Sequence, residues 1–228
     1  MRKLASISPG AIFNFAGEKF VVLEQHEGTA FVLLAQSKVS CPFNDKADAE
    51  DRNNYIGSTL EERTNQWVEK LPRNEAEAAA ILPFDVDLSC TDRSTSYGTI
   101  TVKAAPLTLW QYGQFKELIP LNEDDWWWLV TPWACRWLRS PDTNGAVFVW
   151  LVGTDGRFSS ASRSLGIRPA LLLNSNFSVS LDGEEENESC EAERNANIDL
   201  SKVSITELLA EVKRRVQAPE DSTEEEDS

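Results

Sequence analysis

The sequence predicts an α+β fold, and three observations predict it. Residues 10–35 contain three short apolar runs separated by glycine-containing turns, which is typical of a β-meander. Four later segments begin with a helix-capping residue and continue with apolar residues at helical spacing. Seven of the eight tryptophans lie between Trp110 and Trp150, a density that indicates either a core or a binding surface.

The first strands are predicted at residues 11–15, 19–23 and 30–35. All three runs are rich in phenylalanine, valine, leucine and isoleucine. Gly17 interrupts the chain between the first two runs and Gly28 between the last two, so we expect each connection to be a tight turn.

The first helix is predicted to begin at Ser58, with Glu61 three residues later. In such a capping box the serine hydroxyl accepts a backbone N–H bond and the glutamate returns one. The helix is expected to stop before Pro72. Its inward face is predicted to consist of five residues at helical spacing, namely Leu60, Thr64, Trp67, Val68 and Leu71.

Two further helices are predicted downstream. Asn74 is expected to cap an alanine-rich helix that runs to about Leu82. Thr108 is expected to open a third helix, with Gln111 in the position that completes its cap, and this helix ends near Pro120.

The last predicted helix, residues 204–217, is set apart from the rest. An acidic linker at residues 178–203 precedes it and a disordered acidic tail at residues 218–228 follows it. A helix this short is marginal alone in water, so its apolar stripe must pack on something. We expect self-association into a homo-oligomer or docking of a partner protein, with packing on its own domain as the alternative. The stripe consists of Ile205, Leu208, Leu209, Val212 and Val216.

The net charge of −15 disfavours nucleic-acid binding, because a phosphate backbone attracts basic patches and none is visible. Mimicry of nucleic-acid phosphates by the acidic tail is a less favoured hypothesis. The N-terminal residues are too polar for a signal peptide, and no run approaches the roughly 20 apolar residues of a membrane helix. We therefore expect a cytoplasmic protein with no membrane partner.

Cysteine and histidine usage predicts neither a metal nor another cofactor. The four cysteines, Cys41, Cys90, Cys135 and Cys190, are widely spaced, and His26 is the one histidine. A zinc site needs clustered cysteine and histidine ligands, and this spacing supplies no such cluster. Four reduced thiols are expected, and disulfides are the alternative if the chain is exported without a signal.

Three motifs in the second half are the most distinctive: Trp137-Leu-Arg-Ser-Pro141, Gly153-Thr-Asp-Gly156 and Gly166-Ile-Arg-Pro-Ala-Leu171. Together with Tyr55-Ile-Gly-Ser-Thr-Leu60 and Leu107-Thr-Leu-Trp-Gln-Tyr112, they resemble in order the bacterial and phage family catalogued as domain of unknown function 6273. The resemblance extends over about residues 8–175.

That family looks like a branch of the C-type-lectin-like fold, shared with formylglycine-generating enzymes and with variable proteins of diversity-generating retroelements. The resemblance implies one domain at residues 1–177. It also implies a small twisted antiparallel sheet, two or more flanking helices and a long loop face.

Catalysis of the kinds known in this superfold is poorly supported. An iron site needs several histidines, and the formylglycine-generating branch needs two reactive cysteines in one pocket. Cys90 and Cys135 are the candidate pair, although no spacing argues that they meet. Asp142 and Asn144 lie in a small polar loop, but the tripeptides with which lectins bind calcium are missing. No catalytic residue is assigned.

The tryptophans and arginines near the motifs have a structural interpretation. Trp127 and Trp137 are expected in the core, and strand alternation directs Trp126 and Trp128 to the side opposite Trp127. Arg139 and Arg168 are expected to be buried and to satisfy loop carbonyls, with anion binding as the alternative.

These observations favour a non-enzymatic binding module that recognises a protein or glycan through an aromatic and polar loop face. Diversification of residues 154–164 by a retroelement is a further hypothesis, against an ordinary surface hairpin. The alternatives are a phage structural or host-defence-inhibiting protein acting through its acidic surface or C-terminal helix, and a formylglycine-generating-type enzyme. The candidate ligand-binding residues are Trp133, Asp142, Asn144, Trp150, Asp155, Arg157, Ser159, Ser160, Ser162 and Arg163.

Overall fold

A computed structural model describes residues 1–45, 52–121, 126–134, 148–152, 158–161 and 163–181, with the backbone alone described at 148–152 and 158–160. The chain divides into two compact units, Met1–Glu184 and Glu185–Ser228. All described residues belong to the first unit. Most of the predicted linker, the predicted helix at 204–217 and the acidic tail lie outside the described residues, so those assignments stay predictions.

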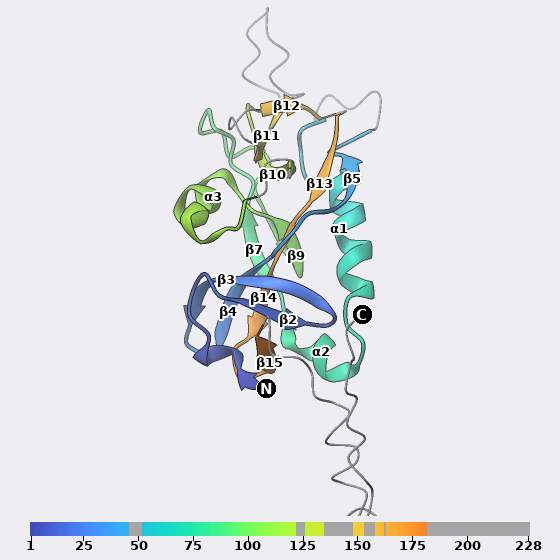
Figure 1. Ribbon diagram of the computed structural model, residues 1–228. Helices are drawn as coiled ribbons and strands as arrows, with labels where there is room; N and C mark the ends of the chain where they lie inside the picture. Colours follow the sequence, from blue (N-terminus) through green and yellow to red (C-terminus); the bar gives the residue numbers. More distant parts are fainter. Residues whose placement is uncertain (46–51, 122–125, 135–147, 153–157, 162, 182–228) are drawn as a thin grey trace, which may run out of the picture. The chain divides into compact units, whose positions relative to one another are not determined.

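The first unit has an α+β fold, as the sequence predicts. Mostly antiparallel strands form a curled half-barrel sheet, accompanied by few, short helices (Figure 1). The largest sheet has eight strands, and β9 (Ala104–Pro106) joins it by pairing with β14. The other seven follow the order β1 (Arg2–Lys3), β15 (Ser178–Leu181), β2 (Ile12–Phe15), β3 (Glu18–His26), β4 (Thr29–Leu34), β14 (Pro169–Asn174) and β6 (Ile81–Leu82).

A second sheet has five strands. Arg168 alone separates β13 (Ser164–Ile167) from β14, so one nearly continuous stretch of chain connects the two sheets (Figure 1). Among the strand pairs of the described residues, β10 (Trp127–Pro132) with β13 is the only parallel one. The strand order is β12 (Phe158–Ser160), β11 (Phe148–Val152), β10 (Trp127–Pro132), β13 (Ser164–Ile167) and β5 (Lys38–Pro42), and β7 (Phe84–Asp87) pairs separately with β8 (Thr99–Val102).

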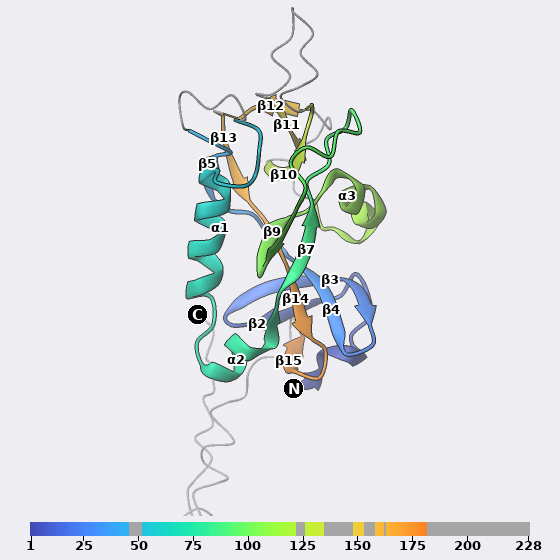
Figure 2. The ribbon, with the colours of Figure 1, turned by 180° about the vertical axis from the view of Figure 1, so that it is seen from behind.

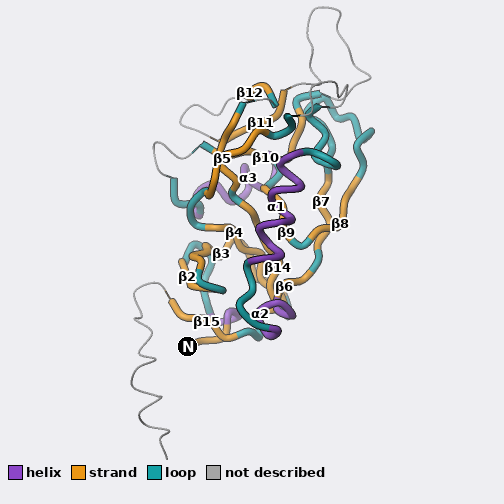
Figure 3. The backbone as a smooth tube through the Cα atoms, turned by 90° about the vertical axis from the view of Figure 1, so that its right-hand side faces the viewer, coloured by secondary structure: helices purple, strands orange, loops and turns teal. Residues whose placement is uncertain are grey.

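The three helices predicted within the described residues are confirmed with their N-caps at Ser58, Asn74 and Thr108, but the return bond predicted at Ser58 is not formed, because the Glu61 carboxylate accepts from the Gly57 N–H instead. Ser58 accepts a hydrogen bond from the Glu61 N–H, and Thr108 and Gln111 form a complete capping box. The longest helix, α1, lies against β5 and β9 (Figures 2 and 3). Its predicted inward face is buried except for the half-buried Trp67. The helices are α1 (Thr59–Lys70), α2 (Glu75–Ala80) and α3 (Leu109–Phe115), with 3-10 turns at η1 (Leu4–Ser6) and η2 (Lys116–Leu118).

Several boundaries differ from the prediction: β3 continues to His26, and α3 ends at Phe115 and is followed by the 3-10 turn η2. Helix α2 ends at Ala80 rather than Leu82, because Ile81 pairs with Leu173 of β14 and takes an extended conformation. Strand β15 occupies residues 178–181, at the start of the segment interpreted as a linker. It pairs with both β1 and β2, so its backbone hydrogen bonds hold it in the main sheet.

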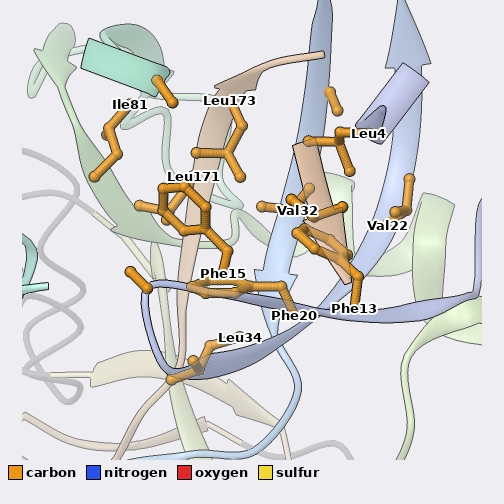
Figure 4. Close-up of a cluster of buried hydrophobic side chains, with 14 of the residues drawn as sticks. Leu4, Phe13, Phe15, Phe20, Val22, Val32, Leu34, Ile81, Leu171 and Leu173 are labelled. Atoms are coloured by element: carbon orange, nitrogen blue, oxygen red, sulfur yellow. The ribbon is translucent and has the colours of Figure 1, made fainter. Parts of the chain in front are cut away.

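The main sheet covers a core cluster built largely from the predicted meander. Phe13 and Phe15 of β2 pack around Phe20 of β3, with ring centroids 6.0 and 6.1 Å from it (Figure 4). Leu171 and Leu173 of β14 complete the same cluster. The alternating phenylalanines of the first hairpin therefore point inward, as the strand period requires.

Strand β10 lies between two further core clusters. Trp127 belongs to one cluster and Trp128 to the other, and both side chains are fully buried. The predicted alternation is thus confirmed, and the side opposite Trp127 is also buried in a core cluster. Both faces of β10 are covered, so the pattern of a strand with one solvated face does not apply here.

Candidate functional site

Trp133 is the predicted binding residue that the structure presents most clearly. It follows the last residue of β10 and its side chain is 39% exposed. The Thr91 hydroxyl donates a hydrogen bond to the Trp133 carbonyl at 2.5 Å, and the Thr91 N–H donates to the Pro132 carbonyl at 3.2 Å. The backbone that carries this indole is therefore held by a second segment of the chain.

A buried asparagine holds the next residue. The Asn53 side chain is fully buried and donates to the Ala134 carbonyl at 2.8 Å. The Tyr97 hydroxyl donates to the Asn53 side-chain oxygen at 2.8 Å, which fixes the orientation of the amide. Two loops, one at Asn53 and one at Thr91–Tyr97, thus fix the positions of Trp133 and Ala134. An exposed aromatic on such a backbone is ready for contact without further ordering.

Sequence reasoning did not find Thr91, Asn53 or Tyr97. Asn53 is 81 residues from Ala134, and Tyr97 is 44 residues from Asn53. Each lies in a turn-rich polar segment, where asparagine, threonine and tyrosine are ordinary. No local spacing connects such residues, and their joint role becomes visible only once the loops are folded together.

A second aromatic contact lies at the other end of β10. The Arg163 guanidinium carbon is 5.6 Å from the centroid of the Trp126 ring, within the range of a cation–π contact. Arg163 is exposed and Trp126 is half-buried. Because Trp126 precedes β10 and Trp133 follows it, the structure does not bring Arg163 and Trp133 together in one patch.

The remaining predicted binding residues are only partly covered by the structure. Trp150 lies on β11 opposite Phe158, and Ser159 and Ser160 lie on β12 opposite Val149 and Phe148. Only the backbone is described there. The other predicted residues, Asp142, Asn144, Asp155, Arg157 and Ser162, and the helix residues Ile205, Leu208, Leu209, Val212 and Val216, lie outside the described residues.

The described cysteines are buried. Cys90 is 1% exposed and its N–H donates to the Ser94 carbonyl, while Cys135 lies outside the described residues. Cys41 is 6% exposed, and burial raises the pKa of its thiol to about 11 despite the opposing charge of Arg63. A thiol with that pKa is protonated near neutral pH and is a poor nucleophile.

Metal ligands do not gather in the described part of the chain. No group of three or more histidine, cysteine, aspartate or glutamate side chains is placed there to hold a metal ion. His26 is exposed, and its Nε2 lies 3.1 Å from a carboxylate oxygen of Glu24. No helix among the described residues is both long and apolar enough to cross a membrane.

The interpretation of Arg168 is confirmed. Its side chain is fully buried and donates to three carbonyls, those of Leu34 at 2.8 Å, Ala35 at 2.6 Å and Pro120 at 3.1 Å. Arg168 thus joins the end of β4 to the segment after η2. Arg139 and Trp137 lie outside the described residues.

No family model, curated protein or solved structure matches this chain. The resemblance to the domain of unknown function 6273 family therefore rests on the motifs quoted above.

Proposed function

We propose that this protein is a non-enzymatic binding module that recognises a protein or glycan through the surface around Trp133. The observation that carries the proposal is an exposed indole on a backbone held by Thr91, beside a residue held by Asn53. Tryptophan is enriched at binding hot spots because it supplies a large contact area at a small entropic cost. A position already fixed by hydrogen bonds reduces that cost further.

We also propose that the α+β fold of this chain is the C-type-lectin-like fold, and that the chain is a relative of the domain of unknown function 6273 family. Antiparallel sheets with α1 and α3 beside them, and the loops that hold Trp133, support this assignment. We further propose that the protein is encoded by a phage or prophage, and that residues 154–164 are diversified by a retroelement. A reverse-transcriptase gene with a template repeat beside this gene would support diversification.

The test compares capture by full-length protein with capture by two variants. Immobilised protein is exposed to a glycan array and to bacterial lysate, and bound glycans and proteins are quantified. We expect Trp133→Ala to lose at least one specific ligand by about tenfold or more, in line with a hot-spot residue, and Trp133→Phe to retain part of the binding.

Leu121→Ala is the matched control, because Leu121 is also a large exposed apolar residue, 56% exposed, outside this surface. It is expected to bind like the parent protein. The proposal fails if Trp133→Ala and Leu121→Ala retain the same ligands at the same level.

The predicted helix at residues 204–217 carries a second, independent part of the proposal. We propose that its apolar stripe mediates self-association or docking of a partner, on the strength of the spacing in the sequence. Light scattering of the full chain and of a Leu208→Asp, Leu209→Asp double variant tests it. A lower mass for the variant supports self-association, and a monomer in both cases excludes self-association and leaves partner docking as the remaining role of the stripe.

A further inference from the structure

A cavity between α1 and β5 stands apart from the surface around Trp133. Its volume is about 430 Å³, within the roughly 300–1,000 Å³ usual for small-molecule sites. One wall is the exposed side of α1, with Arg63, Trp67 and Lys70, and the other is formed by β5 and the β13–β14 segment. We call it the α1–β5 groove. Figures 1 and 2 show α1 running beside β5.

The lining of the groove is largely apolar. Val39 of β5 is 80% exposed, which is unusual for a large aliphatic side chain in a strand. Trp67 is half-buried, and its ring centroid lies 6.4 Å from that of Phe20, so it packs against the main core cluster. Ile167 adds a further aliphatic surface. An apolar ligand body would remove these side chains from water.

Two cations border this apolar lining. Arg63 and Lys70 are exposed and lie two turns apart on α1, which is roughly 10 Å along the helix axis. Neither forms a hydrogen bond or an ion pair with any residue that the structure describes. Lys38 differs, because its ammonium lies 2.6 Å from the Glu18 carboxylate. In a chain with a net charge of −15, two cations with no ion-pair partner among the described residues are notable.

The other titratable groups of the groove restrict the ligand. The Asp45 carboxylate accepts a hydrogen bond from the Thr59 hydroxyl at 2.6 Å, and Thr59 lies one helical turn before Arg63, so this negative charge lies on the Arg63 side of the groove. The Cys41 thiol lines the groove in its neutral form, since burial raises its pKa to about 11. Arg63 and Lys70 outnumber this one carboxylate, so the groove suits an anion on the side of Arg63 that faces Lys70, and its centre suits an apolar group.

We propose that the α1–β5 groove binds a small organic carboxylate with an apolar body. The carboxylate faces the Arg63 guanidinium, whose planar fork matches two carboxylate oxygens, and Lys70 adds a second positive charge. The apolar body lies over Trp67 and Val39. This site is independent of the surface around Trp133, so either can fail without the other.

Methyl-labelled full-length protein and nuclear magnetic resonance test the site with three probes. Hydrocinnamate carries both the charge and the apolar body, hydrocinnamide lacks the charge, and acetate lacks the body. Hydrocinnamate is expected to shift the methyl signals of Val39 and Ile167 in a saturable way. Hydrocinnamide should bind about tenfold more weakly, and acetate should leave both signals in place. Equal affinities for the acid and the amide, or no shift with hydrocinnamate, overturn the proposal.

Two variants that each remove one positive charge show whether binding depends on the groove or on the overall electrostatic field of the protein. Arg63→Gln should weaken hydrocinnamate by about tenfold and leave the affinity for hydrocinnamide unchanged. Lys103→Gln, an exposed cation between β8 and β9, should leave both unchanged. Unaltered methyl signals elsewhere show that both variants are folded. The proposal is overturned if Arg63→Gln has no effect, or if Lys103→Gln weakens binding equally.

Discussion

The guanidinium of Arg168 lies over the indole of Trp127, with its central carbon 4.4 Å from the ring centroid and both side chains fully buried. The same guanidinium donates to the carbonyls of Leu34, Ala35 and Pro120. A single planar cation thus donates to three backbone carbonyls, one at the end of β4 and two in loops, and covers the face of an aromatic ring. Arg168 stands between β13 and β14, so this contact holds the point where the chain passes from one sheet to the other.

Arg168→Lys should lower the free energy of unfolding by roughly 2–3 kcal/mol, because a lysine cannot reach three carbonyls with one planar group. Chemical denaturation of the two proteins measures the difference. Arg93→Lys, at an exposed loop position, is the control and should stay within about 0.5 kcal/mol of the parent. Equal stability of the parent and Arg168→Lys would show that the three carbonyl contacts contribute little.

Gly166→Ala should destabilise the protein by about 1–3 kcal/mol, because the new methyl has no space. A Cβ at this position would lie 2.6 Å from the Ser37 hydroxyl oxygen, 2.7 Å from the Ser37 Cβ and 3.0 Å from the Trp126 carbonyl oxygen. Thermal melts check this expectation, and adding Ser37→Gly to Gly166→Ala should recover part of the loss.

Gly113→Ala is the matched glycine control. Gly113 lies within α3, and a Cβ there would meet nothing within 4 Å. Since alanine is the better helix former, this variant should be more stable by up to about 1 kcal/mol. A loss of stability at Gly113 similar to that at Gly166 would contradict the steric argument.

Glu77→Gln should lower stability at neutral pH and lose its effect in acid. Burial alone would raise the pKa of Glu77, but the hydrogen bonds and charge of Arg73 outweigh it and hold the pKa below its ordinary value of 4.5. A lowered pKa in the folded state stabilises the protein above the unfolded-state pKa, and this contribution is lost as the pH falls through the folded-state pKa. The stabilities of the parent and of Glu77→Gln should therefore converge as the pH falls below the ordinary glutamate pKa and through the lowered folded-state pKa. A constant difference across this range would exclude an ionised Glu77 as the cause.

Trp133→Ala and Trp128→Ala should differ in stability. Trp128 is fully buried and donates from its indole N–H to the Cys41 carbonyl at 3.0 Å, so its removal should cost about 3–5 kcal/mol. Trp133 is 39% exposed, and its removal should cost less than about 1 kcal/mol. Melting temperatures of the two variants measure this. Similar losses would place Trp133 in the core and remove the proposed binding surface.

Local sequence patterns predicted the first three long strands and the starts of three helices, but most of the other strands were not predicted. The Ser58, Asn74 and Thr108 caps act within one helical turn, so neighbouring residues suffice to define each helix start. The phenylalanines of the first hairpin follow the strand period and point inward as expected. The end of α2 could not be predicted in this way, because the pairing of Ile81 with Leu173 ends it.

The sequence by itself thus determined the α+β class, the helix starts, the inward face of α1 and the structural role of Arg168. Only the tertiary structure decided that Trp127 and Trp128 are both buried, and that Asn53 and Thr91 hold the chain at Trp133. It alone placed Arg63 beside Val39 in one groove. The physical reason is the separation of interacting residues along the sequence. Caps and periodicity involve residues within a few positions of one another. The binding surfaces instead depend on contacts between residues far apart in sequence, such as Asn53 and Ala134, which are 81 positions apart.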